Sequence, residues 1–447
     1  MLELVIRGGA VVRPEGVSKA DIGVEGGRIA RIAPEISEPA EAEISADGLH
    51  IFPGHIDVHV HFNEPGNALW EGIETGSSAF AAGGGTLFFD MPLNSVPCTL
   101  DGAEFDRKLA AMRALSHTDF ALWGGLTPAN LDRLPELAER GAIGIKAFMS
   151  NSGMKEFLHA DDGTLYDGMK TAAALGRVVA VHAESDALTA YLSSQLRGAN
   201  RTTWRDYVES RPVFAELEAI SRALILAEET GCKLHIVHIS SGRGVVLAAE
   251  ARARGVDVTL ETCPHYLAFT AEDLAHLGAV GKCAPPLRGE AEADLLWDEV
   301  LAGTLDIIAS DHSPCPPEMK LGADFFGLWG GISGVQSSLN VLLTEGWHRR
   351  SLPLERIASM LSDGPARRFG VEGKGRLEVG FDADLALVDL HETFTLERSH
   401  LLYRHRQSPY IGHTFKGAVK QTFQRGRPIW SEGKVSRPGD VRLVSPT

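Results

Sequence analysis

The sequence lacks the features that define several whole classes of protein. No apolar run among its 447 residues approaches the ~20 that a membrane-spanning helix needs. Cysteine is scarce, with 5 widely spaced residues and no C-x-x-C pair, which indicates free thiols in a reducing compartment. Basic residues are outnumbered, with 43 Lys and Arg against 59 Asp and Glu, and the net charge of −16 repels nucleic acid. We therefore expect neither a membrane protein, nor a disulfide scaffold, nor a nucleic-acid-binding protein.

The first residues also lack a charged segment followed by a long apolar stretch, which is the pattern of an export signal. We accordingly expect the protein in the cytoplasm. Its composition, 44% hydrophobic and 23% charged, is that of an ordinary globular protein. No low-complexity tract or short repeat is present, so disordered and solenoid architectures are excluded.

Both ends of the chain are rich in short β-prone runs that glycines interrupt. These runs are residues 4–6, 11–12 and 29–33 at the start, and residues 375–381, 383–390 and 419–423 at the end. We predict that residues 1–52 and 369–447 pair into one small β domain.

Residues 53–368 have a different pattern, in which short apolar strands alternate with helices. The helical run from Phe214 to Thr230 stops at Gly231, as a left-handed C-terminal cap would require. Thr270 and Asp273 have the spacing of a capping box and predict the start of another helix. Strand–helix units repeated over roughly 300 residues favour an α/β fold with a parallel sheet, either doubly wound or closed into a (β/α)8 barrel.

Side chains of the types that bind metals lie at five of these predicted strands. They are His59 and His61, Lys146, His182, His238 and Asp311. The carboxyl ends of the strands in a parallel barrel converge on one mouth, where active sites are built. Four histidines and an aspartate at that mouth are the ligand set of a zinc-like hydrolytic site.

The two-residue period of a strand restricts which of these side chains can act together. His59 and His61 are two residues apart and therefore share a face. His235 and His238 are three apart and face opposite sides, and Asp311 and His312 cannot both point inward. We select His238 and Asp311 from these pairs.

Each of these residues also has an ordinary structural interpretation. A lone histidine at a strand end is more often hydrogen-bonded in the core, and a lone lysine packs its stem on apolar neighbours while its ammonium stays in water. Five strands with such residues in one chain are difficult to explain independently, so we favour the metal site.

Together with further motifs, this ligand set resembles the cyclic-amide branch of the binuclear amidohydrolase superfamily and, within it, the allantoinase family. The likeness extends over nearly the whole chain. The motifs are Glu64-Pro-Gly, Trp70-Glu-Gly, Met91-Pro-Leu-Asn94, Glu261-Thr-Cys-Pro-His-Tyr, Lys282-Cys-Ala-Pro-Pro, Ser310-Asp-His-Ser-Pro-Cys-Pro-Pro-Glu-Met-Lys320, Trp329-Gly-Gly and Tyr403-Arg-His with Ser408-Pro-Tyr.

The resemblance implies a (β/α)8 barrel with a β-sandwich formed by both termini. It implies that His59 and His61 bind one divalent metal and that His182 and His238 bind the other. Lys146, carboxylated by carbon dioxide, would bridge the two. Asp311 would be a further ligand and the catalytic base. Zinc is the commonest metal in such sites, with cobalt, manganese or iron as alternatives, and tetramers are common among relatives.

The reaction implied by the resemblance is hydrolysis of the cyclic amide of allantoin to allantoate. A hydroxide bridging the two metals would attack the carbonyl, and Asp311 would accept its proton and return it to the leaving nitrogen. Asn94, at a strand end, and Ser313, two residues beyond Asp311, are expected to hydrogen-bond the substrate, and the alternative for each is ordinary loop capping.

Two alternatives remain at this stage. A broad-specificity hydantoinase or dihydropyrimidinase would share the metal site, but such enzymes usually carry a tyrosine shortly after the bridging lysine, where this chain has Met149-Ser-Asn-Ser. A non-enzymatic assembly protein of the same fold would tend to have lost ligands, and all six are present here.

A dihydroorotase is not favoured. Dihydroorotases usually have an arginine two residues after the second histidine, where this chain has Asn63.

Overall fold

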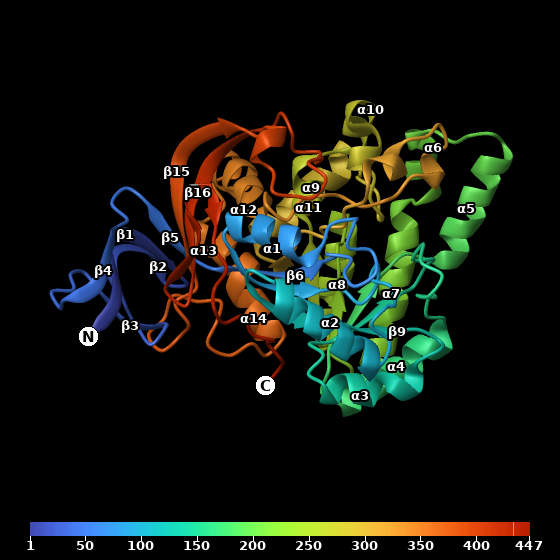
Figure 1. The fold of residues 1–447 in the computed structure, drawn as a ribbon. Coiled ribbons are helices and arrows are strands. Elements are labelled where there is room, and N and C mark those ends of the chain that lie inside the picture. The colour runs from blue at the N-terminus through green and yellow to red at the C-terminus, as the bar shows by residue number, and fades with distance from the viewer. Residues whose placement is uncertain (432) are drawn as a thin grey trace.

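Short buried strands, each followed by one or more helices, form a closed barrel in the middle of this computed structural model, which describes residues 1–431 and 433–447 (Figure 1). The strands are β6 (His55–Val60), β7 (Gly85–Asp90), β8 (Asp119–Leu122), β9 (Gly124–Leu126), β10 (Ile145–Phe148), β11 (Val179–His182), β12 (Leu234–Ile236), β13 (Val258–Thr262) and β14 (Ile307–Ile308). Each strand except β8 pairs in parallel with the next one along the chain. The pairing forms two sheets, β6 to β8 and β9 to β14, and the chain connects them between β8 and β9.

The barrel has eight strand positions because β8 and β9 are consecutive parts of one strand. Trp123 separates them, and its backbone N–H still donates to Asp90 O at 3.1 Å. A parallel bridge between Val60 and His312 joins the last position to the first and closes the ring. The (β/α)8 barrel is thus confirmed, and the doubly wound alternative is wrong.

Helices surround the strands. The long ones are α1 (Ile73–Ala82), α2 (Gly102–Leu115), α4 (Asp162–Ala174), α5 (Asp186–Gly198), α7 (Val213–Thr230), α8 (Gly242–Ala253) and α11 (Glu290–Ala302). The short ones are α3 (Leu134–Glu139), α6 (Trp204–Ser210), α9 (Pro264–Ala268), α10 (Leu274–Leu277), α12 (Ser338–Val341), α13 (Leu354–Ala358) and α14 (Gly364–Arg368). Helix α7 ends at Gly231, whose φ of 64° is the predicted left-handed cap. Thr270 and Asp273 form the predicted capping box, but it opens only a 3-10 turn and the four-residue α10. No helix among the residues described here is long and apolar enough to cross a membrane.

The two ends of the chain share a nine-stranded sheet beside the barrel. Its strands are β1 (Leu2–Arg13), β2 (Gly16–Glu25), β3 (Arg28–Ala33), β4 (Ala40–Ser45), β5 (His50–Pro53), β15 (Leu385–Thr395), β16 (Thr414–Gln424), β17 (Arg427–Ser431) and β18 (Lys434–Val435). The N-terminal and C-terminal strands meet where β5 pairs with β15. The predicted strand at 375–381 is wrong, because those residues form turns and loop.

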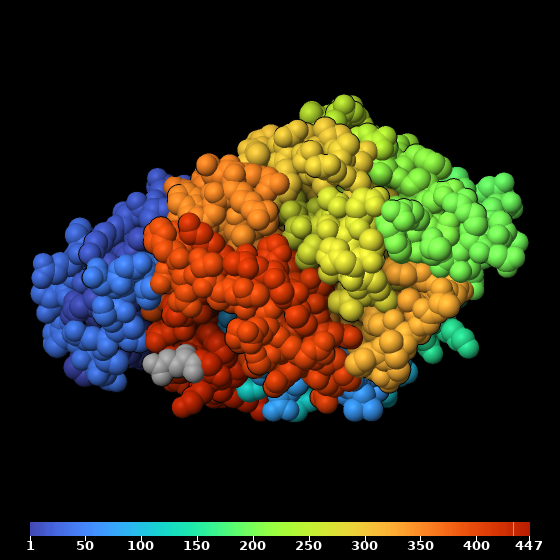
Figure 2. All heavy atoms as spheres, turned by 90° about the horizontal axis from the view of Figure 1, so that it is seen from above, coloured from blue at the N-terminus to red at the C-terminus, as the bar shows by residue number. Residues whose placement is uncertain are grey.

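The C-terminal segments connect the sheet to the barrel. Seen from above, they lie between the N-terminal strands and the middle of the chain (Figure 2). The tail continues back to the barrel, where Phe120 N–H donates to Arg442 O at 3.0 Å and Val444 N–H donates to Phe120 O at 2.8 Å. The barrel mouth, opposite this tail contact, carries the predicted site residues.

Candidate metal centre

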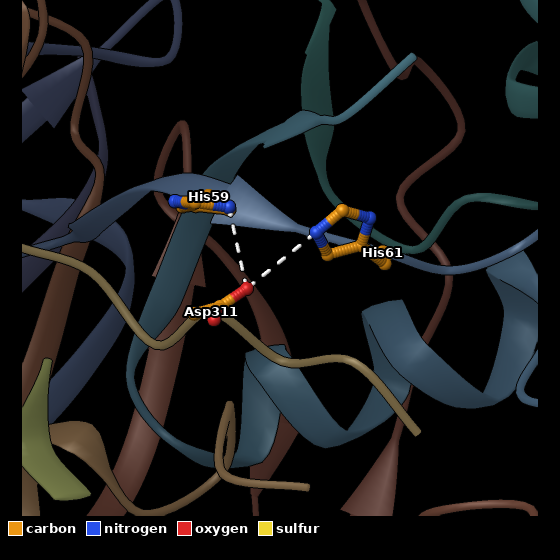
Figure 3. A group of neighbouring side chains, drawn as sticks. All are labelled: His59, His61 and Asp311. Atoms are coloured by element: carbon orange, nitrogen blue, oxygen red, sulfur yellow. Dashed lines mark ion pairs between the residues drawn. The ribbon is translucent and has the colours of Figure 1, made fainter. Parts of the chain in front are cut away.

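His59, in the first barrel strand β6, and His61, one residue beyond its end, both point toward Asp311, which follows the last strand (Figure 3). Asp311 Oδ1 lies 3.3 Å from His59 Nε2 and 3.5 Å from His61 Nε2. Atoms bound to a zinc-like ion at about 2.0–2.2 Å are roughly 3.3–3.6 Å apart along a tetrahedral edge. The three side chains are buried and their ligand atoms have the spacing that one divalent ion requires.

The second predicted pair lies beside the first. His182 Nδ1 and His238 Nε2 face each other at 3.0 Å, and the rings of His59 and His238 have their centroids 5.3 Å apart. This is a hydrogen-bond distance, shorter than the edge expected for two ligands of one ion, and it places the two ring nitrogens side by side. The structure therefore brings all four predicted histidines into one region with Asp311.

Lys146, in β10, lies near these groups, and its amine is 4.8 Å from the centroid of the Phe148 ring. Its side chain is fully buried, and its amine makes no hydrogen bond within the described residues. Burial lowers the pKa of Lys146 to about 7, although Glu261 and Asp311 act in the opposite direction. An unpaired buried amine is costly, so this position fits a chemically modified lysine better than a free ammonium.

Left-handed backbone is concentrated at the site. His238 has a φ of 39°, Asp311 of 44°, Asn94 of 68° and Asn63 of 65°, out of seven non-glycine residues with positive φ in the described part of the chain. Such conformations cost free energy and tend to cluster at functional sites. The prediction that strand alternation sets the direction of His238 and Asp311 is therefore wrong. Strand β12 ends at Ile236 and β14 at Ile308, so the local backbone conformation sets these directions instead.

Two buried carboxylates that sequence reasoning missed orient the histidines. Glu261 accepts from His59 Nδ1 at 2.9 Å and from the His238 backbone N–H at 3.0 Å, and its other oxygen is 2.9 Å from His235 Nε2. Glu184 lies 2.8 Å from His182 Nε2. Each carboxylate engages one ring nitrogen and leaves the other for a metal. Glu261 is near the end of β13, so the rule used for the other strands could have found it.

The protonation states suit metal ligands. Burial lowers the pKa values of His61, His182 and His238, which favours neutral imidazoles. Burial acts to raise the pKa of Asp311, but the adjacent His59 and His61 outweigh it, so this pKa is lowered and the carboxylate is ionised. Neutral imidazole and ionised carboxylate are the forms that bind divalent ions.

A cleft of ≈ 420 Å³ opens over these groups. The predicted substrate contacts Asn94 and Ser313 both line it, and Asn94 Nδ2 donates to Ser313 Oγ at 3.4 Å. Arg211 and Lys282 also line it, and sequence reasoning missed both because neither ends a strand. Lys146 does not line the cleft, as its complete burial requires.

A second group of carboxylates, Asp119, Asp382 and Asp384, also has metal-like spacing. Lys374 Nζ lies 2.9, 3.0 and 2.6 Å from these three side chains. The ammonium group of Lys374 therefore occupies the position that a metal ion would take, and we assign no metal to this cluster.

Comparison with known proteins agrees with the fold and the site. Residues 50–429 match the model of the amidohydrolase family. An allantoinase of Solibacter usitatus is 56% identical over 100% of this chain and 97% of that protein, and an allantoinase of Deinococcus radiodurans is 54% identical over 100% and 99%. The solved structure of an L-hydantoinase (dihydropyrimidinase) from Arthrobacter aurescens superimposes with a TM-score of 0.97 at 34% identity, covering 100% of both chains. The resemblance inferred from the motifs is confirmed, and the chain belongs to the amidohydrolase family.

Proposed function

We propose that the protein hydrolyses the cyclic amide bond of allantoin to give allantoate. The observation that carries this proposal is the identity of 56% and 54% to two allantoinases over the full chain. The cleft adds physical support, because four histidines and Asp311 line it beside polar groups that suit a ureide. The L-hydantoinase, similar at 34% identity, supports the alternative of a broad-specificity hydantoinase or dihydropyrimidinase.

We propose that His59 and His61 hold one divalent metal, that His182 and His238 hold the other, and that Asp311 is a further ligand. Zinc is the metal we expect, and cobalt, manganese or iron are the alternatives. The spacings of 3.3 and 3.5 Å from Asp311 to His59 and His61 support the first site. The facing ring nitrogens of His182 and His238 support the second. When bound, two divalent ions supply charge that lowers the pKa of a water from about 15.7 toward about 7 and polarises a carbonyl.

The side chains of the protein have separate roles in this reaction. Asp311, kept ionised by His59 and His61, accepts a proton from water and returns it to the leaving ring nitrogen. Asn94 and Ser313 hydrogen-bond the ring and hold its carbonyl in place. Glu261 and Glu184 hold the imidazoles in the orientation that the reaction needs.

We propose that Lys146 carries a carbamate that bridges the metals. A neutral amine is required, since the nitrogen lone pair forms the bond to the carbon of CO2 and a proton is released. The buried, unpartnered position of Lys146 supports this modification. Lys146→Ala should lose activity and recover part of it when short carboxylic acids are added, because their two oxygens replace those of the carbamate. Failure of these acids to restore any activity would contradict the bridge.

The decisive experiment measures allantoin hydrolysis and metal content on the same purified sample. We expect rapid formation of allantoate and close to two divalent ions per chain. Fast opening of dihydrouracil with a negligible rate on allantoin would favour the hydantoinase. A chain with no stoichiometric metal, and no activity after reconstitution with metal and bicarbonate, would be a non-enzymatic scaffold.

Other features of the protein stay predictions. We propose a homotetramer, tested by sedimentation against four times the chain mass of 48.1 kDa. We also propose a cytoplasmic location, which the five buried free cysteines support, and domain boundaries at residues 52/53 and 368/369.

A further inference from the structure

The cleft contains two cations that no step of the proposed reaction uses. Arg211 and Lys282 both line it, while Asp311 is the single carboxylate among the lining residues. Both cations lie against one aromatic ring, with Lys282 Nζ 4.5 Å and the guanidinium carbon of Arg211 5.7 Å from the centroid of Tyr207. We call Tyr207, Arg211 and Lys282 the cationic end of the cleft.

The cationic end is fixed in place beside the metal-binding residues. Arg211 ion-pairs with Glu184, and the same carboxylate oxygen lies 2.8 Å from His182 Nε2. The backbone carbonyl of Arg211 accepts from Arg288. A single oxygen atom therefore separates the guanidinium from a predicted metal ligand, so the cationic end begins next to the place where the reacting amide must lie.

The two cations retain hydrogen-bond donors for a ligand. A guanidinium has five N–H groups, and Glu184 is the acceptor that the described residues offer the Arg211 side chain. Burial lowers the pKa of Lys282 to about 7. Its protonated form has three N–H donors, of which the backbone carbonyls of Phe326 and Leu328 take two. Asn151 and Ser152 add further polar groups to the lining. This arrangement suits a ligand that brings a carbonyl oxygen to the cationic end.

We propose that Arg211, assisted by Lys282, binds the ureido carbonyl of allantoin and so determines the preference for a ureido-substituted ring. This inference rests on the proposed function. The ureido group is bonded directly to the hydantoin ring, so it lies beside the ligand set when the ring amide is positioned for attack. A site built to hydrogen-bond a polar group discriminates strongly against an analogue that lacks it, because its donors are then left unpaired.

The test compares kcat/KM for allantoin and for unsubstituted hydantoin in the metal-loaded enzyme. Arg211→Met should lower the allantoin-to-hydantoin ratio by at least about 30-fold, mainly through KM for allantoin, as expected for a lost charged hydrogen bond. Arg211→Lys keeps a cation for Glu184 but loses the planar fork, so we expect an intermediate ratio. Lys282→Met should lower the ratio less than Arg211→Met.

The matched control is Arg205→Met. Arg205 is an exposed arginine of α6, the helix that Arg211 follows, and it pairs with Glu272 at the surface. The allantoin-to-hydantoin ratio of kcat/KM in Arg205→Met should therefore equal that of the wild type. Equal losses on both substrates in Arg211→Met would show that Arg211 acts through Glu184 and His182. That result would overturn this inference and leave the proposed function intact. A wild type that opens hydantoin but not allantoin would overturn both.

Discussion

Two buried clusters in this protein look alike as groups of side chains but differ in what compensates their charge. His59, His61 and Asp311 form one, and Asp119, Asp382 and Asp384 form the other, each with ligand atoms within 4.8 Å of one another. The first has two imidazoles beside a single carboxylate, and the nearby amine of Lys146 makes no hydrogen bond within the described residues. The second surrounds Lys374, and Arg425 also pairs with Asp119.

The two buried lysines show the difference most clearly. Burial lowers the pKa of Lys146 to about 7. Burial acts in the same direction on Lys374, but Asp384, Asp119 and Asp382 outweigh it and raise its pKa. The Lys374 ammonium thus holds the second cluster together as a structural joint, by which we mean ion pairs that connect barrel strand β8 to the segment leading into β15. A cluster without such an ammonium is left able to bind an exchangeable cation.

Removing the charge of Asp311 should have the largest effect. Asp311→Asn cannot accept a proton, so we expect kcat for allantoin to fall by about 10²–10⁴-fold. The imidazoles remain, so most of the metal should stay bound, as measured by metal analysis of the same sample. A rate near that of the wild type would show that the base is misassigned.

Breaking the second cluster should affect stability instead of activity. Lys374→Met leaves three buried carboxylates with too little compensating charge, and we expect a loss of about 3–5 kcal/mol in the free energy of unfolding, measured by urea denaturation. Because oxygen ligands suit Ca²⁺, millimolar calcium should restore part of this loss in the variant and have no such effect on the wild type. An unchanged stability would refute the role of Lys374 as a joint.

A smaller effect should follow from disturbing the orientation of the first cluster. Glu261→Gln removes the charge that holds His59 and supports the backbone of His238, so we expect about 10–100-fold weaker metal binding. Competition with a chelator measures this affinity. Glu272→Gln, at an exposed surface carboxylate, is the control and should leave it unchanged.

The smallest expected effect is that of Lys146→Met on stability, which we compare with the effect of Lys374→Met. In metal-free protein, Lys146→Met removes a buried amine that makes no hydrogen bond within the described residues, so the free energy of unfolding should change by less than about 1 kcal/mol or increase. A loss as large as that of Lys374→Met would mean that Lys146 is held by contacts equivalent to those of Lys374, and that the two clusters do not differ as described here.

Much of the barrel and of its ligand set could be predicted from the sequence. Alternating strands and helices are local patterns that glycine and capping residues often mark, and α7 with Gly231 followed them closely. The two-residue spacing predicts that His59 and His61 point the same way, and both point toward Asp311, although β6 ends at Val60. By contrast, β12 and β14 proved too short for alternation to set the direction of His238 and Asp311.

The residues that were missed act through contacts between distant segments. Glu184 reaches Arg211 across 27 residues, and Lys282 reaches the carbonyl of Leu328 across 46. In the sequence, nothing distinguishes Lys374 from any other lysine. Only the fold brings Asp119 beside it. No spacing rule along the chain marks such residues.

By itself, the sequence determined the order of strands and helices, the shared face of His59 and His61, and the kinds of side chain that reach the barrel mouth. These follow from the periodicity of single elements and from short motifs. Only the tertiary structure decided that Glu261 holds His59, 202 residues away, and that one buried lysine is left unpaired while another is surrounded by carboxylates. The physical reason is that charge compensation in a protein interior depends on which groups barrel closure brings within a few ångströms, and that is a property of the whole fold.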